Sequence, residues 1–302
     1  MGDVRDSAML HAQGLSQKQI ERLVRSGRLF RVERGVFTTA PPEGELLLRA
    51  LCHRRPHLVF TGRTALEVRE GAAITLPVQC LVPEGKSVHC GPQMTVQRRR
   101  KVRYQVVRGL RVALRAAAVA DATDVPDEVL IRYLESEFTG HRGKRWLESE
   151  VGHLSRIPAR FHALVSRAAI GADSEAERMV ARALLARGFE VEQNVRIGNY
   201  YFDCLLRKAK VIVEIDGYRY HSAENLETFV RDRWKANHAV RQGYRVLRYS
   251  GSCVTHHLAQ LVEQIIAAVE GREEMPVVES LPVWEWHHVM TREPPWRDQV
   301  AE

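Results

Sequence analysis

Apolar residues recur at helical spacing in the first forty residues and then condense into two short extended segments. A helix is predicted directly after Ser16, where Ser16 and Gln19 have the spacing of a capping box, and Gly27 marks its end. The apolar segments on either side of Gly35 predict a β-hairpin. Residues 1–42 are therefore expected to form helix, turn, helix and hairpin.

The region that follows has a weaker pattern. Residues 45–54 and 127–137 have helical periodicity, and residues 78–82 and 102–107 are typical of strands. This combination predicts a mixed α/β domain over residues 43–170.

The pattern is strongest after Ser174, and it predicts the order α-β-β-β-α-β-α over residues 171–271. No element is assigned to the tail at residues 272–302. The fold class expected for the whole chain is therefore mixed α/β. The predicted helices of the 171–271 domain are 175–187, 224–242 and 258–269, and its predicted strands are 189–197, 200–206, 210–216 and 244–249.

Composition narrows the possible partners and compartments. With 45 Lys and Arg against 37 Asp and Glu, the net charge is +8, and the apolar share of 45% excludes global disorder. A basic chain of this kind favours a polyanionic partner, first of all nucleic acid. No apolar run reaches the roughly 18–20 residues that cross a bilayer, and the acidic start is unlike a signal peptide. Five scattered cysteines fit a reduced cytoplasm, so we expect a cytoplasmic protein without a membrane partner.

Two carboxylates interrupt neighbouring apolar strands in the last domain. Asp203 lies in one strand and Glu214 in the next, and alternation places Ile212, Glu214 and Asp216 on one face. A carboxylate in an apolar strand is costly to bury unless it is paired or bound to a metal. Because adjacent strands bring these carboxylates together, we expect them to bind Mg²⁺ or Mn²⁺. The alternative is a strand-end Asp and an edge-strand Glu that both reach solvent.

Two further residues are candidates for the same site. Glu177 lies in the first turn of the preceding helix on its sheet-facing side, although Ser174 and Glu177 also have the spacing of a capping box. His221 follows Asp216 closely, and a histidine beside carboxylates can orient a water, protonate a leaving oxygen or contact phosphate. The alternative for His221 is a purely structural role.

These residues resemble the PD-(D/E)XK nuclease superfamily and, within it, the bacterial domains related to very-short-patch repair endonucleases. The resemblance implies a restriction-endonuclease-like core with Asp203 as the central metal ligand. It also implies that Glu214 and the Ile215 carbonyl are further ligands, and that Glu177 binds the metal or its water. The motifs are Ser174-x-x-Glu177, Asp203, Val213-Glu214-Ile215-Asp216-Gly217-x-x-x-His221, Arg231-Asp232-Arg233 and Gly243-Tyr244-Arg245-Val246-Leu247-Arg248.

One position departs from the superfamily pattern. A lysine is expected two residues after the second acid, but this chain has Asp216 there. In the very-short-patch enzymes the positions that match Asp216 and His221 are both histidines. Either His221, Lys235 or a second metal replaces the lysine, or the site is weak or inactive.

The first forty residues resemble the winged-helix domain of AbiEi-type antitoxins. The resemblance implies binding to duplex DNA, with the helix from Gln17 in the major groove and the hairpin as the wing. The alternative is a solvated basic face. The expected DNA-contacting residues of this segment are Gln17, Lys18, Arg22, Arg25, Arg28, Arg31 and Arg34.

Two other basic groups are candidates for DNA contact. The run Arg98, Arg99 and Arg100 is either a phosphate-binding strand edge or an exposed basic hairpin. Arg231, Arg233 and Lys235 lie on the polar helix and are expected to hold the DNA strand through phosphate contacts.

The function expected from these features is metal-dependent hydrolysis of DNA phosphodiester bonds, with Asp216 and His221 among the catalytic residues. A rival expectation is a DNA-binding autorepressor or antitoxin whose nuclease domain has lost its chemistry. Single-stranded DNA and RNA stay open as substrates, and a toxin or repair partner is unidentified.

Overall fold

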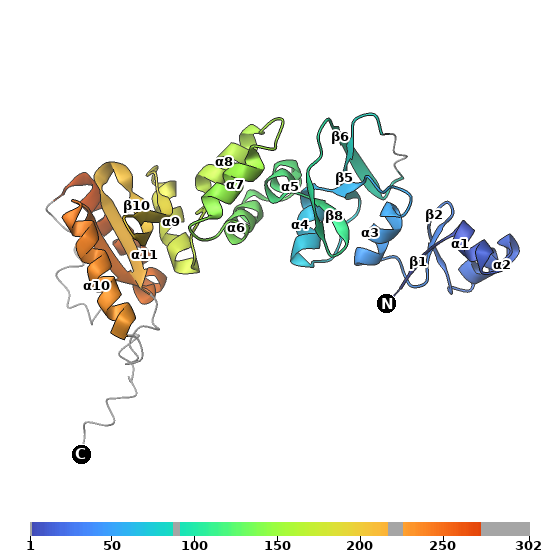
Figure 1. The fold of residues 1–302 in the computed structure, drawn as a ribbon, viewed down its shortest axis with the longest axis horizontal. Coiled ribbons are helices and arrows are strands. Elements are labelled where there is room, and N and C mark those ends of the chain that lie inside the picture. The colour runs from blue at the N-terminus through green and yellow to red at the C-terminus, as the bar shows by residue number, and fades with distance from the viewer. Residues whose placement is uncertain (1, 87–90, 217–225, 273–302) are drawn as a thin grey trace, which may run out of the picture. The chain divides into compact units, whose positions relative to one another are not determined.

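The computed structural model describes residues 2–86, 91–216 and 226–272, and it confirms the mixed α/β class. The chain divides into two compact units. One contains Met1–Leu130 and Leu147–His162, and the other contains Ile131–Trp146 and the chain from Ala163 onward. Figure 1 shows the element order along the chain. The domain boundaries at 42, 170 and 271 stay a prediction.

The N-terminal residues form two helices against a small sheet with the order β1-β3-β2. Both bonds of the predicted capping box form, since the Ser16 hydroxyl accepts from the Gln19 N–H and the Gln19 side chain accepts from the Ser16 N–H. The predicted hairpin is also present, and an additional strand, β1, pairs with its second strand. The elements are β1 (Val4–Asp6), α1 (Ser7–Ala12), α2 (Gln17–Arg25), β2 (Phe30–Glu33) and β3 (Val36–Thr38).

The next part of the first unit contains a five-stranded mixed sheet with the order β6-β5-β4-β8-β7. The predicted helix 45–54 and strand 78–82 are confirmed. The strand expected at 102–107 begins at Tyr104, because Val102 packs against the core beneath β4 and β5. The elements are α3 (Gly44–Cys52), β4 (Val59–Phe60), α4 (Gly62–Glu70), β5 (Val78–Pro83), β6 (Met94–Arg99), β7 (Tyr104–Val107), β8 (Leu110–Ala113) and α5 (Arg115–Asp121).

Three helices follow: α6 (Asp127–Glu137), α7 (Gly143–Val151) and α8 (Ala159–Arg167). The bounds of α6 are those predicted. Its fully buried Glu135 accepts from the Ala169 N–H at 2.9 Å and from the Arg182 guanidinium, also at 2.9 Å. Because a buried carboxylate needs partners, this pair fixes α6 against the following domain of the second unit.

The second unit contains a four-stranded sheet with the order β12-β11-β10-β9, between α9 and α11 on one face and α10 on the other (Figure 1). The predicted order α-β-β-β-α-β-α is confirmed. The last helix begins at Gly251, earlier than predicted, because Ser250 caps it through the Cys253 N–H. The elements are α9 (Glu175–Ala186), β9 (Glu192–Ile197), β10 (Tyr200–Leu206), β11 (Val211–Asp216), α10 (Leu226–Arg241), β12 (Arg245–Ser250) and α11 (Gly251–Glu270).

The described residues allow a partial check of the expectations about membrane spans and cysteines, and they do not include every candidate residue. Among those residues, no helix combines the length and apolar character that a bilayer span requires. Cys52, Cys80, Cys204 and Cys253 are free thiols. The candidate residue His221 and the tail at 273–302 lie outside the described residues.

Candidate active site

The candidate site is built around an irregularity of β10 at Asp203. Phe202 packs in the apolar layer beneath α10, whereas Cys204 packs in the layer of α9 and α11. Regular alternation would place both side chains on one face. On β9, Asn194 stands between the partners of these two residues with a left-handed φ of 49°. The distortion places Asp203 at the boundary between the two layers.

Asp203 and Glu214 are joined by two hydrogen bonds across the β10–β11 pair. The Asp203 N–H donates to Glu214 Oε1 at 3.2 Å, and Asp203 Oδ2 accepts from the Ile215 N–H at 2.7 Å. Each carboxylate therefore accepts from the backbone of the opposite strand. The structure brings the two predicted acids together, and their shared environment is buried, since Glu214 is only 5% exposed.

Glu177 lies buried in the first turn of α9, and the negative charge of Asp203 contributes to raising its pKa. Ser174 caps the helix by accepting from the Glu177 N–H at 3.1 Å. The Glu177 carboxylate accepts from the Asp173 N–H at 2.8 Å, one residue before the partner that a capping box uses. Glu177 is therefore held at the helix start with its carboxylate directed at the loop beside Asp203.

All three acids have raised pKa values. Burial, followed by the charge of Asp203, raises the pKa of Glu214 to about 7. Burial likewise raises the pKa of Asp203, with Asp216 and Asp173 acting in the same direction. The pKa of Glu177 is also raised, first by burial and then by Asp203. Burial and the charge of the half-buried Asp203 thus disfavour the charged forms of the two buried glutamates.

Lys235 of α10 is the cation that the structure places beside these acids. Its Nζ lies 2.5 Å from Glu214 Oε2 and 4.9 Å from the centre of the Phe202 ring. The Lys235 side chain is 17% exposed, so the pair is largely shielded from water. Lys235 therefore reaches the second acid from a helix, whereas the superfamily pattern places its lysine on the strand.

Asp216 is engaged elsewhere. Arg248 of β12 forms two hydrogen bonds with the Asp216 carboxylate, at 3.0 Å and 2.6 Å. The parallel pairing of β11 with β12 brings Arg248 opposite Glu214 and within reach of Asp216. The charge of Asp216 is therefore balanced by Arg248.

The carboxylate oxygens of the site are of the chemical type that binds a divalent ion, but they are not arranged as a complete metal site. Carboxylate oxygens are the ligands that Mg²⁺ and Mn²⁺ prefer, and both ions keep several waters in place of further protein ligands. Across the described ranges, however, no three Asp, Glu, His or Cys side chains are grouped closely enough to hold a metal together. The backbone contact of Ile215 with Asp203 is through its N–H. The full ligand set of Asp203, Glu214, Ile215 and Glu177 stays a prediction.

Sequence reasoning assigned no individual role to three residues around the site. Asn194 donates from its side chain to Asp173 at 3.1 Å and to the Gly171 carbonyl at 2.7 Å. Asp173 adds negative charge beside Asp203, and Arg248 neutralises Asp216. For Asp173 the sequence did contain a signal, because this acid directly precedes the Ser174-x-x-Glu177 motif. The positions of Asn194 and Arg248 depend on strand register, which the sequence does not specify.

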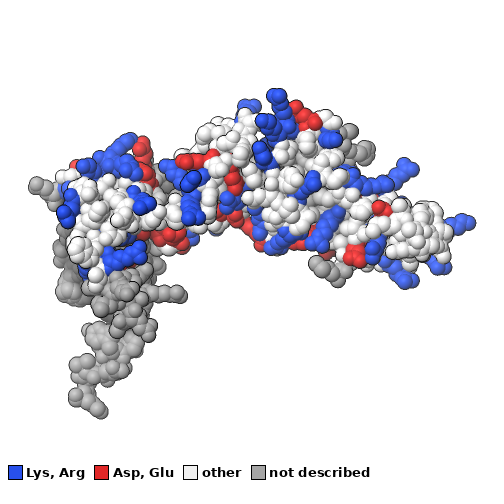
Figure 2. Space-filling view, in the orientation of Figure 1, with Lys and Arg blue, Asp and Glu red and all other residues white. Residues whose placement is uncertain are grey.

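The predicted DNA-contacting residues of the N-terminal segment are all on the surface. Lys18, Arg22 and Arg25 share one exposed face of α2, and none of the three forms an ion pair with a described carboxylate. Basic side chains stand out from this end of the chain in Figure 2. The remaining members are exposed as well: Gln17, Arg28, Arg31 and Arg34.

The other basic candidates divide into two environments. Arg98 and Arg100 are exposed, whereas Arg99 between them is half-buried and paired with the buried Asp121. On α10, Arg231 and Arg233 are exposed, while Lys235 points into the acidic site. Exposure permits phosphate contact by these arginines, and their DNA contact stays a prediction.

Solved structures resemble the chain only distantly. The catalytic domain of the homing endonuclease I-Bth0305I is 19% identical, with a TM-score of 0.28, and the match covers 34% of this chain and all of that domain. The Rv2827c protein of Mycobacterium tuberculosis is 17% identical, with a TM-score of 0.32, and the match covers 55% of this chain and 76% of that one. No curated protein matches the sequence.

The family comparison concerns the second unit. The model of the restriction-endonuclease-like family REase_MTES_1575 matches residues 177–269. This segment begins at Glu177 and includes Asp203, Glu214 and Lys235. The matched segment is less than a third of the chain, and it is nuclease-like.

Proposed function

We propose that the protein is a divalent-metal-dependent DNA endonuclease that hydrolyses phosphodiester bonds. The observation that supports this most strongly is an excess of buried negative charge. Glu177 and Glu214 are buried, the charge of the half-buried Asp203 raises the pKa of both glutamates, and Lys235 is the cation in contact with Glu214. A divalent cation would relieve this imbalance, because the carboxylates would then stay charged at neutral pH.

Asp203 and Glu214 would hold the ion, with Glu177 reaching it directly or through a water. When bound, Mg²⁺ or Mn²⁺ supplies a water of lowered pKa and charge neutralisation for the phosphate oxygens. The Ile215 N–H holds one oxygen of Asp203, which leaves the other available. The backbone therefore orients the carboxylate before any ligand arrives.

Lys235 would serve in place of the lysine that the motif lacks. Its ammonium is fixed by Glu214 and by the Phe202 ring, so it needs no reorganisation to stabilise charge that develops on a phosphate. Asp216 would act indirectly, by holding Arg248 at the edge of the site. His221 keeps its expected role as a water-orienting or phosphate-contacting residue.

The substrate would be delivered by two basic surfaces. Arg231 and Arg233 are exposed on the helix that supplies Lys235, where they would hold the strand through its phosphates. The AbiEi-like segment would bind duplex DNA through α2, with Lys18, Arg22 and Arg25 toward the groove. The resemblance to very-short-patch repair enzymes supports DNA, rather than RNA, as the substrate.

A second candidate function follows from the Lys235–Glu214 pair. If this ammonium permanently replaces the divalent ion, the second unit is a binding domain without chemistry, and the protein is a DNA-binding repressor or antitoxin. That reading predicts salt-sensitive DNA binding without cleavage under any divalent ion.

One assay separates the two functions. The protein is incubated with supercoiled, linear and single-stranded DNA, and with RNA, in Mg²⁺, Mn²⁺ or EDTA. We expect cleavage of DNA that requires Mg²⁺ or Mn²⁺ and that is lost in Asp203→Ala, while this variant still binds DNA. Cleavage by Asp203→Ala at the original rate would overturn the assignment, and absence of cleavage with every substrate would favour the binding protein.

A further inference from the structure

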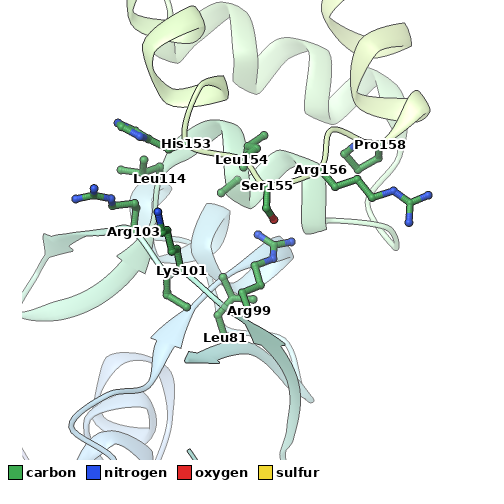
Figure 3. Close-up of a pocket in the computed structure, with 12 residues that line it drawn as sticks. Leu81, Arg99, Lys101, Arg103, Leu114, His153, Leu154, Ser155, Arg156 and Pro158 are labelled. Atoms are coloured by element: carbon green, nitrogen blue, oxygen red, sulfur yellow. The ribbon is translucent and has the colours of Figure 1, made fainter. Parts of the chain in front are cut away.

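A basic pocket lies in the first unit, outside the acidic site. Its volume is about 230 Å³, and it lies between the end of β6 and the connection from α7 to α8. Figure 3 shows Arg99 and Lys101 extending toward this connection, where Leu154 and Ser155 face them. In the space-filling view, Lys and Arg side chains gather at the top of the visible face, where β6 and this connection lie (Figure 2).

The floor of the pocket is apolar. Leu81, Leu114, Ala117 and Leu154 line it, and all four belong to the apolar cluster under β4 and β5. Such a floor offers dispersion contacts to a flat or ring-shaped body but no hydrogen bonds. A simple inorganic anion would not use these side chains.

The rim of the pocket is cationic. Lys101, Arg103 and Arg156 line it together with Arg99 and His153, and no Asp or Glu is among the lining residues. In the described part of the chain, no ion pair involves Lys101, Arg103 or Arg156. A rim of this composition attracts an anion with several oxygens.

The side chain of Arg99 is held in place by the buried Asp121. Its guanidinium pairs with Asp121, whose side chain is 4% exposed, and Asp121 accepts in turn from the Thr61 hydroxyl at 2.5 Å. The charge of Arg99 is therefore balanced, but its orientation toward the pocket is fixed before a ligand binds. Preorganised donors of this kind cost little conformational entropy on binding.

We propose that this pocket binds a phosphorylated nucleotide. The phosphate would meet the cationic rim, and the base and sugar would lie on the apolar floor. The volume suits one small ligand, and its concave form suits a group that projects from its surroundings, which the regular backbone of a duplex does not offer. The two sources of such a group are a free nucleotide and the phosphorylated end of a DNA strand. The proposal goes beyond the nuclease function and does not depend on it.

Two arginines outside the pocket provide a matched control. Arg142 and Arg145 are exposed, and neither of them lines the pocket. The double variants Lys101→Glu/Arg103→Glu and Arg142→Glu/Arg145→Glu change the net charge equally. The variant Ser155→Trp fills the pocket without changing charge, and its site is exposed.

The test is calorimetric binding in EDTA, which prevents cleavage from affecting the result. The probes are deoxyadenosine 5′-monophosphate, deoxyadenosine, inorganic phosphate and a short single strand with or without a 5′-phosphate. We expect the monophosphate or the phosphorylated strand to bind the unmodified protein. We expect about tenfold or greater weakening in Lys101→Glu/Arg103→Glu and in Ser155→Trp, and a change within about twofold in Arg142→Glu/Arg145→Glu.

The comparison among the probes shows whether the ligand is a strand end or a free nucleotide, and it also shows whether the proposal fails. Tighter binding of the 5′-phosphorylated strand than of the monophosphate assigns the pocket to strand ends, and the reverse assigns it to free nucleotides. The proposal is overturned if neither phosphorylated probe binds, or if inorganic phosphate binds as tightly as the monophosphate. It is also overturned if the Arg142/Arg145 variant loses as much affinity as the Lys101/Arg103 variant.

Discussion

Lys235 Nζ lies 2.5 Å from Glu214 Oε2, and both side chains are largely buried. The lysine comes from α10 and the glutamate from β11, so the pair joins the helix to the sheet at the candidate site. A buried ion pair contributes little to stability on balance, because desolvation offsets the attraction. Its presence here is better explained by a role for the ammonium in the proposed chemistry.

Replacement of Lys235 tests that role. In Lys235→Ala, Glu214 keeps a buried charge without its ammonium, so we expect the free energy of unfolding at pH 8 to fall by about 3 kcal/mol. We also expect cleavage per folded molecule to fall about 100-fold, since a preorganised cation is lost. Thermal unfolding and single-turnover cleavage measure the two effects separately.

The exposed Lys208 provides the control for this variant. Its side chain is 82% exposed and pairs with the exposed Glu190, so Lys208→Ala should change neither quantity appreciably. If Lys235→Ala loses stability but its folded fraction cleaves at the original rate, Lys235 is structural and another group assists the reaction.

The raised pKa of Glu214 predicts how stability depends on pH. A carboxyl whose pKa is about 7 in the folded state and 4.5 in its ordinary state binds more protons when folded. Its contribution is therefore favourable below about pH 4.5 and is lost as pH rises through 7. This difference between the folded and the ordinary pKa of Glu214 corresponds to about 3 kcal/mol in the free energy of unfolding. The stability of Glu214→Gln relative to the unmodified protein should therefore rise by about this amount between pH 5 and pH 8, in EDTA.

The comparison with Glu214→Gln separates this effect from that of Asp203 and Glu177, whose pKa values are also raised, because both acids are present in the two proteins. The pKa values of Glu175 and Glu192 are lowered by hydrogen bonds from Arg178 and Arg207, so their contributions are lost only at pH below the ordinary carboxyl range. Urea unfolding of both proteins across the pH series makes the measurement. A constant stability difference across the series would contradict the assigned pKa of Glu214.

Asp216 is predicted to act through Arg248 rather than on the substrate. Asp216→Asn keeps the shape of the side chain and removes a charge that Arg248 balances. We expect cleavage within about threefold of the original rate and a stability loss of about 1 kcal/mol or less, because the pair is partly exposed. Initial cleavage rates decide the matter: an Asp216→Asn protein as inactive as an Asp203 variant would place Asp216 among the catalytic residues.

The N-terminal segment is predicted to bind DNA through the exposed face of α2. Because each phosphate contact contributes about 0.9 to the slope of log affinity against log salt, Lys18→Ala/Arg22→Ala/Arg25→Ala should reduce that slope by about 3. Anisotropy titrations of duplex DNA over a salt series give the slope. The control Arg142→Ala/Lys144→Ala/Arg145→Ala removes the same charge from another exposed segment. Equal slopes for the two triple variants would show that α2 does not contact the duplex.

The domain that contains the site was largely predictable from sequence. Apolar alternation and glycine positions determine β10 and β11, and the short turn between them brings Asp203 and Glu214 together. The first unit was less predictable, since β4 has only two residues and β6 is a mostly polar strand. Short or polar strands depend on their neighbours in the sheet, so they have little local signal.

The partners of the acids could be predicted only in part. Asp216 meets Arg248 because β11 and β12 pair in parallel, and nothing local specifies that register. Lys235 is predicted to contact DNA from a polar helix and, as one alternative, to replace the missing lysine, and the structure places its ammonium 2.5 Å from Glu214. Such contacts follow from packing of the layers, which sequence periodicity does not describe.

The central claim is that Asp203 and Glu214 together hold a divalent ion, and binding of Mn²⁺ at neutral pH tests it most directly. Titration calorimetry without DNA should detect one site in the unmodified protein, and no binding in Asp203→Asn or Glu214→Gln under the same conditions. The Asp216→Asn variant should bind Mn²⁺ as the unmodified protein does. Equal Mn²⁺ affinity in the Asp203→Asn and Glu214→Gln variants would contradict the claim.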